Sequence, residues 1–221
     1  MQLSFTEENY LKAIYHLSDG GNTNVNTNSL AESMNTSPAS ANDMVKRLSQ
    51  KKLIVHQKYK GATLLTKGEE MALRIIRKHR LWEVFLVEKL SFKWDEVHEI
   101  AEQLEHIRSP LLISRLDKFL GYPKVDPHGD PIPNEKGEMK ETVKASASDL
   151  TVGTKGIIVS VSNDDSTLLK HLDNIGIKLG VKITIVDRMK FDGSVSVKVD
   201  EKETQFISKP IADNLMITAI V

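Results

Sequence analysis

Residues 37–68 read SPASANDMVKRLSQKKLIVHQKYKGATLLTKG, and this stretch decides the fold of the N-terminal part of the chain. Ser37 followed by Pro38 predicts a helix start, because serine caps free amide groups and proline suits the first helical position. Leu53–Val55 and Thr63–Thr66 are β-rich runs on either side of a basic turn. A helix followed by two strands is the second half of a winged helix-turn-helix.

The residues before this stretch supply the first half of the same motif. Thr6 is the expected N-cap of a first helix whose apolar face runs from Tyr10 to Leu17. Asp19–Asn28 is rich in glycine and asparagine and is expected to be a loop. Ser29–Met34 is then a short second helix, so that two helices and a turn precede the wing.

The charge distribution and the helix that starts at Pro38 both favour DNA as a partner. Residues 1–80 contain 12 Lys/Arg and 7 Asp/Glu, whereas residues 81–221 contain 18 and 23. No arginine has an obvious guanine contact, so we expect reading by shape, thymine methyl contacts and phosphate clamps. Use of the motif for protein contacts is the alternative. The predicted DNA contacts are Ser37, Pro38, Ala39, Ser40, Asn42, Asp43, Lys46, Arg47, Lys58 and Lys60.

The middle of the chain is predicted to be helical over Lys67–Leu90, Trp94–Arg108 and Pro110–Leu120. These helices carry more apolar surface than a DNA-binding module of ~70 residues buries alone, which favours a homodimer interface. Tyr122–Lys140 contains four prolines and two glycines and is expected to be an extended linker.

The C-terminal part changes character and predicts a small β domain of SH3-like size. Short strands are expected at Lys155–Val161, Lys182–Val186, Ser194–Val199 and Met216–Val221, with a helix over Ser166–Ile175. The predicted fold class is therefore mainly α with a small β domain. We expect a winged helix-turn-helix DNA-binding domain at 1–72, a helical metal-binding and dimerisation domain with a Pro-rich linker at 73–140, and an SH3-like domain at 150–221.

One segment of the middle region carries a dense set of metal donors. Val97–Ile107 reads VHEIAEQLEHI, and on a helix His98, Glu102, Glu105 and His106 share about a quarter of the surface. The chain has no cysteine, so its donors are imidazole and carboxylate groups. That set suits manganese, iron(II), cobalt or zinc. The alternative is a polar, solvated helix face.

Further donors lie on the neighbouring helices. His79 and Glu83 are four residues apart on the preceding helix, and the first helix offers Glu8 and Asn9. No apolar run reaches the roughly 18 residues that span a membrane, and the N-terminus lacks the features of a secretory signal. With the absence of cysteine, this favours a cytoplasmic protein without membrane partners.

The sequence resembles the diphtheria toxin repressor and manganese transport regulator family of metal-dependent transcriptional repressors. The resemblance covers nearly the whole chain, including the SH3-like domain of the longer members. It is carried by TEENYLKAIY (Thr6–Tyr15), SPASANDMVKRL (Ser37–Leu48), YKGATLLTKG (Tyr59–Gly68), RKHRLWEVFL (Arg77–Leu86), VHEIAEQLEH (Val97–His106) and DPHGDPIP (Asp126–Pro133).

The resemblance implies a homodimer that binds a palindromic double-stranded DNA operator when loaded with a divalent metal. It implies a primary, activating metal site made by Asn9, Glu102, Glu105 and His106. It also implies an ancillary site of His79, Glu83 and His98, with Asp164 or Asp165 as the donor from the SH3-like domain.

Three positions bear on the choice of metal. Iron-responsive members have cysteine at the position of Glu102, whereas manganese-responsive members have glutamate. Manganese-responsive members usually have aspartate at the position of Asn9, so asparagine here removes one negative charge. Lys12 stands where some short members place a carboxylate, which makes a two-metal site of that type doubtful. Manganese(II) is favoured, with iron(II) close behind.

The predicted function is a cytoplasmic, Mn(II)- or Fe(II)-activated, dimeric DNA-binding repressor of metal-uptake genes, without enzyme activity. Two alternatives remain. One is a winged-helix regulator with a non-metal effector. The other is a metal-dependent hydrolase, which is disfavoured because it needs an open coordination position and a general base, and no nucleophile constellation accompanies the donors.

Overall fold

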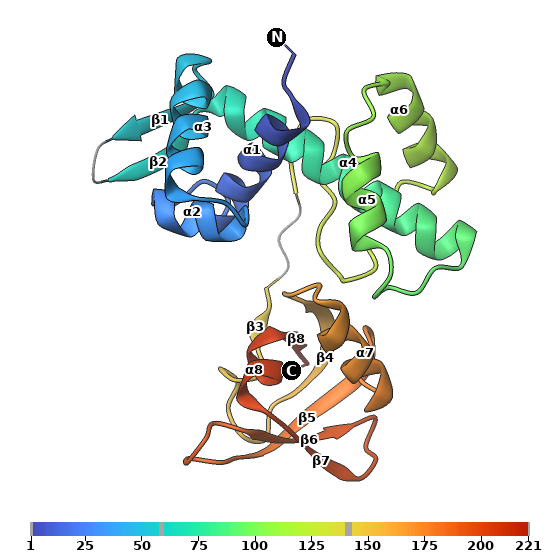
Figure 1. Cartoon of the computed structure of the whole chain (residues 1–221). Helices are drawn as coiled ribbons and strands as arrows, with labels where there is room; N and C mark the ends of the chain where they lie inside the picture. Colours follow the sequence, from blue (N-terminus) through green and yellow to red (C-terminus); the bar gives the residue numbers. More distant parts are fainter. Residues whose placement is uncertain (1, 58–59, 140–142, 221) are drawn as a thin grey trace. The chain divides into compact units, whose positions relative to one another are not determined.

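The computed structural model describes residues 2–57, 60–139 and 143–220, and it divides into two compact units (Figure 1). The first unit comprises Met1–His79, Glu102–Ile113 and Pro133–Met139. The second comprises Arg80–Ala101, Ser114–Ile132 and Lys140–Val221. Each unit therefore contains segments that are far apart in the sequence.

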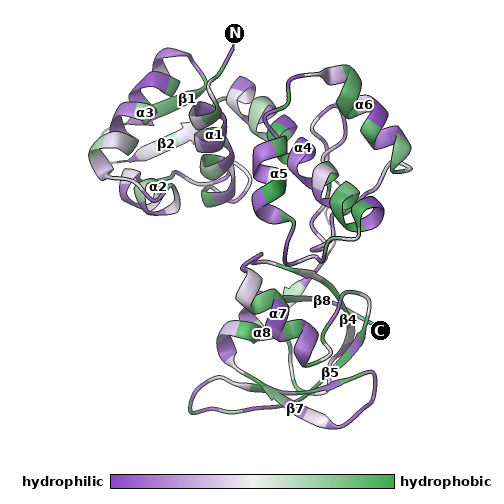
Figure 2. Ribbon diagram, turned by 45° about the vertical axis from the view of Figure 1, so that its right-hand side comes forward, coloured by the Kyte–Doolittle hydropathy of each residue, from purple (hydrophilic) through white to green (hydrophobic). Residues whose placement is uncertain are grey.

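The first unit contains the predicted winged helix-turn-helix. Its elements are α1 (Phe5–Leu17), α2 (Thr27–Ser33), α3 (Pro38–Gln50), β1 (Ile54–Gln57) and β2 (Gly61–Leu64). The two strands pair antiparallel, with Ile54 opposite Leu64. Apolar residues from all three helices and both strands form one buried core, which includes Leu11, Leu30 and Leu48. The polar and apolar sides of α3 are visible in the hydropathy colouring of Figure 2.

Helix starts follow the capping chemistry of the sequence, with one correction. Ser37 caps α3, and its side chain accepts a hydrogen bond from the amide of Ser40 as expected. The predicted N-cap Thr6 is wrong, because α1 begins at Phe5 with Ser4 as its cap. Ser4 and Glu7 form a reciprocal capping box, in which each side chain accepts from the other residue's amide. Glu7 lies three residues after Ser4 and so fixes this earlier start.

The helical middle of the chain consists of α4 (Thr66–Leu90), α5 (His98–Leu104) and α6 (Pro110–Phe119). The predicted helix Trp94–Arg108 is too long at both ends. At its start, the Glu96 side chain and amide pair with Lys93 in a local turn, so the helix begins only at His98. At its end, the amide of Ile107 bonds the carbonyl of Leu104 in a tighter turn. Glu105 and His106 therefore follow the helix instead of continuing its face.

The second unit contains the C-terminal β domain. Strands β3 (Ala145–Ser146), β4 (Lys155–Val161), β5 (Lys182–Arg188), β6 (Val195–Val199), β7 (Thr204–Ile207) and β8 (Leu215–Ala219) form an antiparallel sheet in the order β3-β8-β4-β5-β6-β7. Helices α7 (Ser166–Asn174) and α8 (Lys209–Asn214) complete it. The core includes Ile158, Leu169, Leu172 and Ile217. The expected class, mainly α with an SH3-like β domain, is confirmed, whereas β3, β7 and α8 were not predicted.

Candidate metal centres

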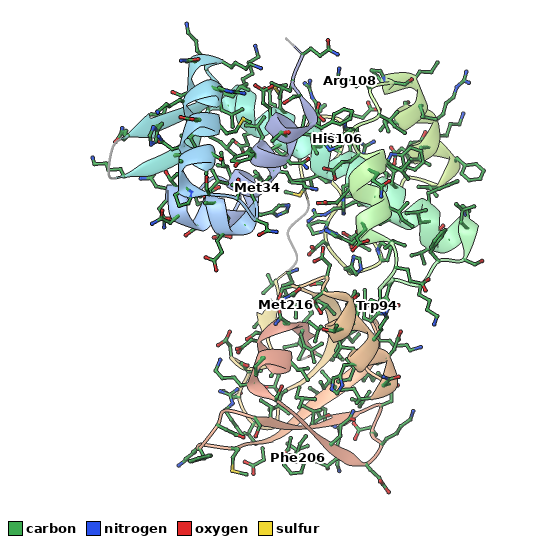
Figure 3. The ribbon with its side chains drawn as sticks, in the orientation of Figure 1. Met34, Trp94, His106, Arg108, Phe206 and Met216 are labelled. Atoms are coloured by element: carbon green, nitrogen blue, oxygen red, sulfur yellow. The ribbon has the colours of Figure 1, made fainter. Side chains whose placement is uncertain are left out.

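The first donor group consists of Glu8, Asn9, Glu102, Glu105 and His106, which all belong to the first unit. Nδ1 of His106 forms a hydrogen bond of 2.6 Å with Oε2 of Glu8. Its ring stacks on Phe5, with the ring centroids 4.4 Å apart. Glu8 and Phe5 lie in the first two turns of α1, so the N-terminal helix directly contacts the segment after α5. Figure 3 shows His106 and Arg108 in this region.

Lys12, also on α1, lies between two of the three carboxylates of this group, those of Glu102 and Glu105. Its Nζ is 2.8 Å from both oxygens of Glu105 and 3.0 Å from Oε1 of Glu102. The Lys12 side chain is 12% exposed and that of Glu105 is fully buried. The ammonium group is therefore the positive charge that neutralises this pair of carboxylates.

Glu105 is further fixed by His79 of α4, whose Nδ1 lies 2.6 Å from Oε2 of Glu105. Burial opposes the ionisation of Glu105, but hydrogen bonds and charge from His79 and Lys12 outweigh it and lower the pKa of Glu105. Glu105 is thus an ionised carboxylate held from two sides, in the form that a metal ligand requires. His79, predicted in the ancillary site, contacts the first donor group.

Asn9 carries the observation that most directly fits a cation-binding site. Its side-chain Oδ1 is buried and has no hydrogen-bond partner among the described residues. A buried amide oxygen without a donor is rare, and a bound cation or water would satisfy it. Carboxylate, imidazole and amide oxygen donors together suit Mn(II) or Fe(II). In the part of the chain that the structure describes, however, the ligand atoms of Glu102, Glu105 and His106 do not form a group of three within 4.8 Å.

Arg108 holds the start of the chain against the same segment. Its Nη2 donates to the carbonyl oxygen of Leu3 at 2.7 Å, and its guanidinium lies over the ring of Phe5 at 5.6 Å. Leu3 itself is buried. The residues that lead into α1 are therefore fixed beside the first donor group.

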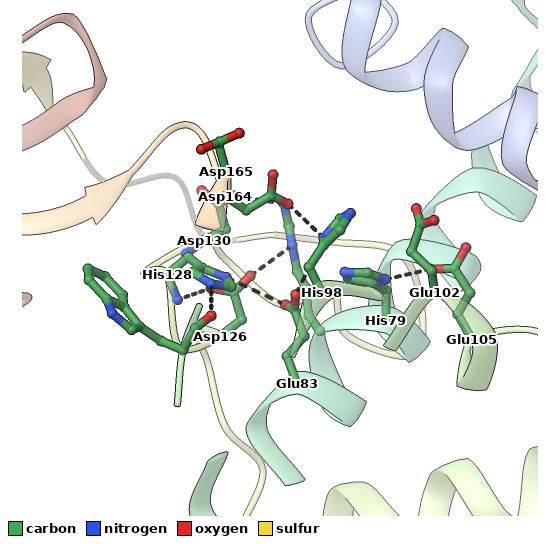
Figure 4. A network of polar contacts seen from close by, with 12 residues as sticks. His79, Glu83, His98, Glu102, Glu105, Asp126, His128, Asp130, Asp164 and Asp165 are labelled. Carbon is green, nitrogen blue, oxygen red and sulfur yellow. Dashed lines mark hydrogen bonds and ion pairs between the residues drawn. The ribbon is translucent and has the colours of Figure 1, made fainter. Parts of the chain in front are cut away.

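The second donor group lies in the second unit and contains Glu83, His98 and Asp164 (Figure 4). His98 Nδ1 is 2.7 Å from Asp164 Oδ2 and 3.9 Å from Glu83 Oε1. The hydrogen bond from His98 holds the pKa of Asp164 below its usual value despite burial. Asp165, the alternative ligand, instead caps α7 by accepting from the amides of Thr167 and Leu168. The structure thus places Asp164, and not Asp165, against His98.

Sequence reasoning missed Asp126 and His128 near this group. Glu83, Asp126 and His128 are all buried, and one ligand atom from each lies within 4.8 Å of the others. His128 Nδ1 is 3.8 Å from Glu83 Oε2, and Asp126 Oδ2 is 3.3 Å from Nε of Arg80. The histidine and two aspartates of DPHGDPIP are a usable signal for such a group, although the motif supported only the linker prediction and the family resemblance.

The predicted DNA contacts that the structure describes lie at the start of α3, along α3 and on the wing. Ser37, Pro38, Ala39, Ser40, Asp43, Lys46 and Arg47 are exposed along α3, and Asn42 is half-buried. Lys60 is exposed at the tip of the wing, and Lys58 lies outside the described residues. Asp43 and Lys46 form an exposed ion pair at 3.2 Å. The face is polar and accessible, as contact with base edges and phosphates requires.

Comparison with known proteins places the chain in a family. Three family models match it: the DNA-binding domain of iron-dependent repressors at residues 2–62, their metal-binding and dimerisation domain at 66–134, and the FeoA domain at 146–219. The iron-dependent repressor IdeR of Mycobacterium leprae is 31% identical over 192 residues, which cover 81% of this chain and 83% of IdeR. The chain belongs to the iron-dependent repressor family.

Other members of the iron-dependent repressor family agree with this assignment over the full length. The diphtheria toxin repressor of Corynebacterium diphtheriae is 27% identical and covers 91% of this chain and 92% of its own. A manganese-dependent transcriptional repressor solved with manganese is 33% identical, with a TM-score of 0.90 over 97% of this chain and 100% of that one. The resemblance stated from the sequence motifs is confirmed. None of the described helices is long and apolar enough to cross a membrane.

Proposed function

We propose that this member of the iron-dependent repressor family is a homodimeric transcriptional repressor that Mn(II) or Fe(II) activates to bind a palindromic operator and silence metal-uptake genes. One observation carries the proposal: α1 of the DNA-reading module contacts the donor-bearing segment through Glu8–His106 and through Lys12 with Glu102 and Glu105. A change of charge at these donors therefore acts directly on the first helix of the DNA-reading module.

Asn9, Glu102, Glu105 and His106 would hold the activating metal, and Glu8 is an additional oxygen donor beside His106. The metal supplies positive charge that binds oxygen and nitrogen donors from two segments at once. The chain's own part is to present Glu105 ionised, to orient His106 by stacking on Phe5, and to fix α1 by its capping box. The metal activates only if it binds the DNA-competent state more tightly than the other state.

A second, ancillary site is proposed from Glu83, His98 and Asp164, together with His79. Asp165 is not included in this site, because its Oδ1 already accepts two amide hydrogen bonds as the N-cap of α7. His98 bonded to Asp164 links α5 to the start of α7 within the second unit.

Manganese is favoured over iron because the donors at Glu102 and Glu105 are carboxylates and the chain has no cysteine. Asn9 weakens this preference, since an amide oxygen brings no negative charge. The physiological metal follows from operator affinity measured against buffered Mn(II), Fe(II), Co(II) and Zn(II).

We propose that residues 1–72 read DNA, that residues 73–140 bind metal and form the dimer, and that residues 150–221 form a supporting SH3-like domain. On α3, Lys46 and Arg47 contact phosphates while Ser37, Ala39 and Ser40 approach base edges. The two recognition helices of a dimer read half-sites about one turn of DNA apart. The protein acts in the cytoplasm, where its DNA lies, and has no enzyme activity.

The test is an operator-binding titration with and without Mn(II), using DNA selected from a random duplex pool by the metal-loaded protein. Affinity is expected to rise at least about tenfold with Mn(II), and the rise is expected to disappear in Glu105→Ala. Glu99→Ala, an exposed carboxylate on the preceding helix α5, is the control and is expected to respond like the wild type. Equal affinity with and without metal contradicts the proposal.

The same titration separates the alternative of a non-metal effector. That alternative is supported by two results together. The protein purified without chelator contains no divalent metal, and it binds its selected DNA tightly after treatment with a cell extract depleted of metals. A metal-dependent hydrolase would turn over phosphoester or peptide substrates, whereas the proposed repressor leaves both intact.

A further inference from the structure

We infer that Lys12 is a built-in competitor for the activating metal: its ammonium group occupies the first donor group until a divalent ion displaces it. Lys12 thereby sets the metal concentration at which the protein responds. The inference rests on the proposed function, because it concerns the same donors.

The contacts of Lys12 are those of a bound cation. Its Nζ lies 2.8 Å from each oxygen of Glu105 and 3.0 Å from an oxygen of Glu102. Glu105 is fully buried, and a buried carboxylate beside a second one is unfavourable without a positive partner. Lys12 provides that partner from α1, across 93 residues of sequence.

A metal ion and this ammonium group compete for the same atoms. Divalent ions bind carboxylate oxygens at roughly 2.0–2.6 Å. An ion held by both oxygens of Glu105 would occupy the space in front of the carboxylate that Nζ fills at 2.8 Å. Two cations at such separation repel strongly in a buried site. The lysine stem is flexible, so the ammonium group can leave towards water when the ion enters.

The competition also separates two roles of the donors. In the metal-free protein Lys12 neutralises Glu102 and Glu105 and keeps α1 against this segment. In the loaded protein the metal takes over that role. The apparent association constant for metal is then the intrinsic constant multiplied by the small fraction of molecules in which Lys12 has left the carboxylates.

The first measurement uses the wild-type protein. Amine-reactive labelling with mass spectrometry compares Lys12 with Lys51, which pairs with Glu7 on the same helix. Lys12 is expected to be protected without metal and to become several-fold more reactive when Mn(II) is added, while Lys51 stays constant. Unchanged protection of Lys12 in protein with a full complement of Mn(II) overturns the inference.

The second measurement is calorimetry of Mn(II) binding to the full-length protein, with His98→Ala in every sample to remove the second donor group. Lys12→Met is expected to bind roughly tenfold more tightly, because the competitor is gone while the methylene packing remains. Lys12→Arg keeps the charge and is expected not to tighten binding. Lys51→Met is the control for loss of an α1 ion pair.

The Lys12→Met substitution is expected to raise the affinity for metal but to lower the stability of the metal-free protein. Lys12→Met is expected to unfold at lower urea concentration than Lys51→Met in the presence of chelator, because Glu102 and Glu105 both lose the ammonium group that pairs with them. Binding by Lys12→Met that is no tighter than that of the parent overturns the inference alone. Binding that survives Glu105→Gln undiminished overturns both the inference and the proposed metal site.

Discussion

The Nε2 atom of His128 lies 2.8 Å from the carbonyl oxygen of Trp94, and this contact fixes the tautomer of the histidine. A carbonyl oxygen only accepts, so Nε2 carries the hydrogen that it donates to Trp94. Nδ1 is the atom 3.8 Å from Glu83. His128 thus joins the DPHG turn to the loop before α5, with its Nδ1 facing Glu83 of the second donor group.

His128→Leu is expected to lower the free energy of unfolding by about 1–3 kcal/mol, because it leaves the partly buried Trp94 carbonyl without its donor. Urea unfolding in the presence of chelator measures the change. His171→Leu, at an exposed position of α7, is the control and should change stability by less than about 0.5 kcal/mol. Equal effects of the two substitutions would show that the contact with Trp94 does not stabilise the fold.

The ionisation of Asp126 is expected to lower the free energy of unfolding as the pH rises. Burial and the nearby charge of Glu83 raise the pKa of Asp126 to about 7, although Arg80 opposes the shift. A raised folded-state pKa contributes stability below the unfolded value near 4, and this contribution is lost between about pH 4 and pH 7. Asp126→Asn keeps an oxygen that can accept from the amides of His128 and Asp130.

We therefore expect Asp126→Asn to gain stability relative to wild type by at least about 1 kcal/mol more at pH 7.5 than at pH 5. Urea unfolding at both pH values, with chelator, measures the difference. Asp192→Asn supplies the opposite sign: hydrogen bonds from the amide and hydroxyl of Ser194 lower the pKa of Asp192, so its contribution is lost only as the pH falls below about 4. A difference between Asp126→Asn and wild type that does not vary with pH contradicts the prediction.

Gly61 is required where the wing meets the loop before α2. Its φ is +96°, and an added Cβ would lie 2.4 Å from the carbonyl oxygen of Val25. Val25 and Ala62 exchange two backbone hydrogen bonds at this place, so neither chain can easily retreat. Gly61→Ala is expected to destabilise the protein by about 2–4 kcal/mol, through backbone strain and a steric clash together.

Gly21→Ala separates the two contributions. Gly21 has a nearly identical φ of +94°, but an added Cβ would meet no atom within 4 Å. We expect a loss of only about 1 kcal/mol there, from strain alone. Similar thermal midpoints for the two variants would mean that the contact with Val25 is unimportant.

Arg47, exposed on α3, is expected to contact a phosphate. Arg47→Ala should weaken DNA binding at all sequences alike and reduce the slope of log affinity against log salt by about 1. Fluorescence anisotropy at several salt concentrations measures the slope. Arg74→Ala removes an exposed arginine of α4 outside the predicted contact face and should leave the slope unchanged. A loss of affinity confined to one DNA sequence would indicate base reading by Arg47 instead.

Local signals were sufficient for most of the fold. The capping serine and proline at the start of α3 and the 3.6-residue pattern of α4 are properties of short segments, and both helices formed where expected. The helix predicted over Trp94–Arg108 is longer than the observed α5, because the apolar pattern of the sequence continues on both sides of α5. The side chain of Glu96 and the turn at Ile107 compete with helical hydrogen bonds there.

The donor groups were predictable in type but not in their partners. Glu8, Glu105 and His106 were expected as donors, whereas the Lys12–Glu105 and Glu8–His106 contacts join residues more than 90 positions apart. No local pattern encodes such a pairing. The choice between Asp164 and Asp165 likewise depended on which carboxylate the start of α7 uses as its cap.

The anchoring of Leu3 by Arg108 has a practical consequence for protein production. Arg108 donates to the carbonyl oxygen of Leu3, and Phe5, two residues later, stacks on His106 of the first donor group, so the chain at Leu3 is held close to these donors. An N-terminal polyhistidine tag would bring a row of imidazoles beside the proposed manganese donors and contribute ligands of its own. Metal titrations of this protein are therefore best made with a removable tag, cleaved before the first addition of metal.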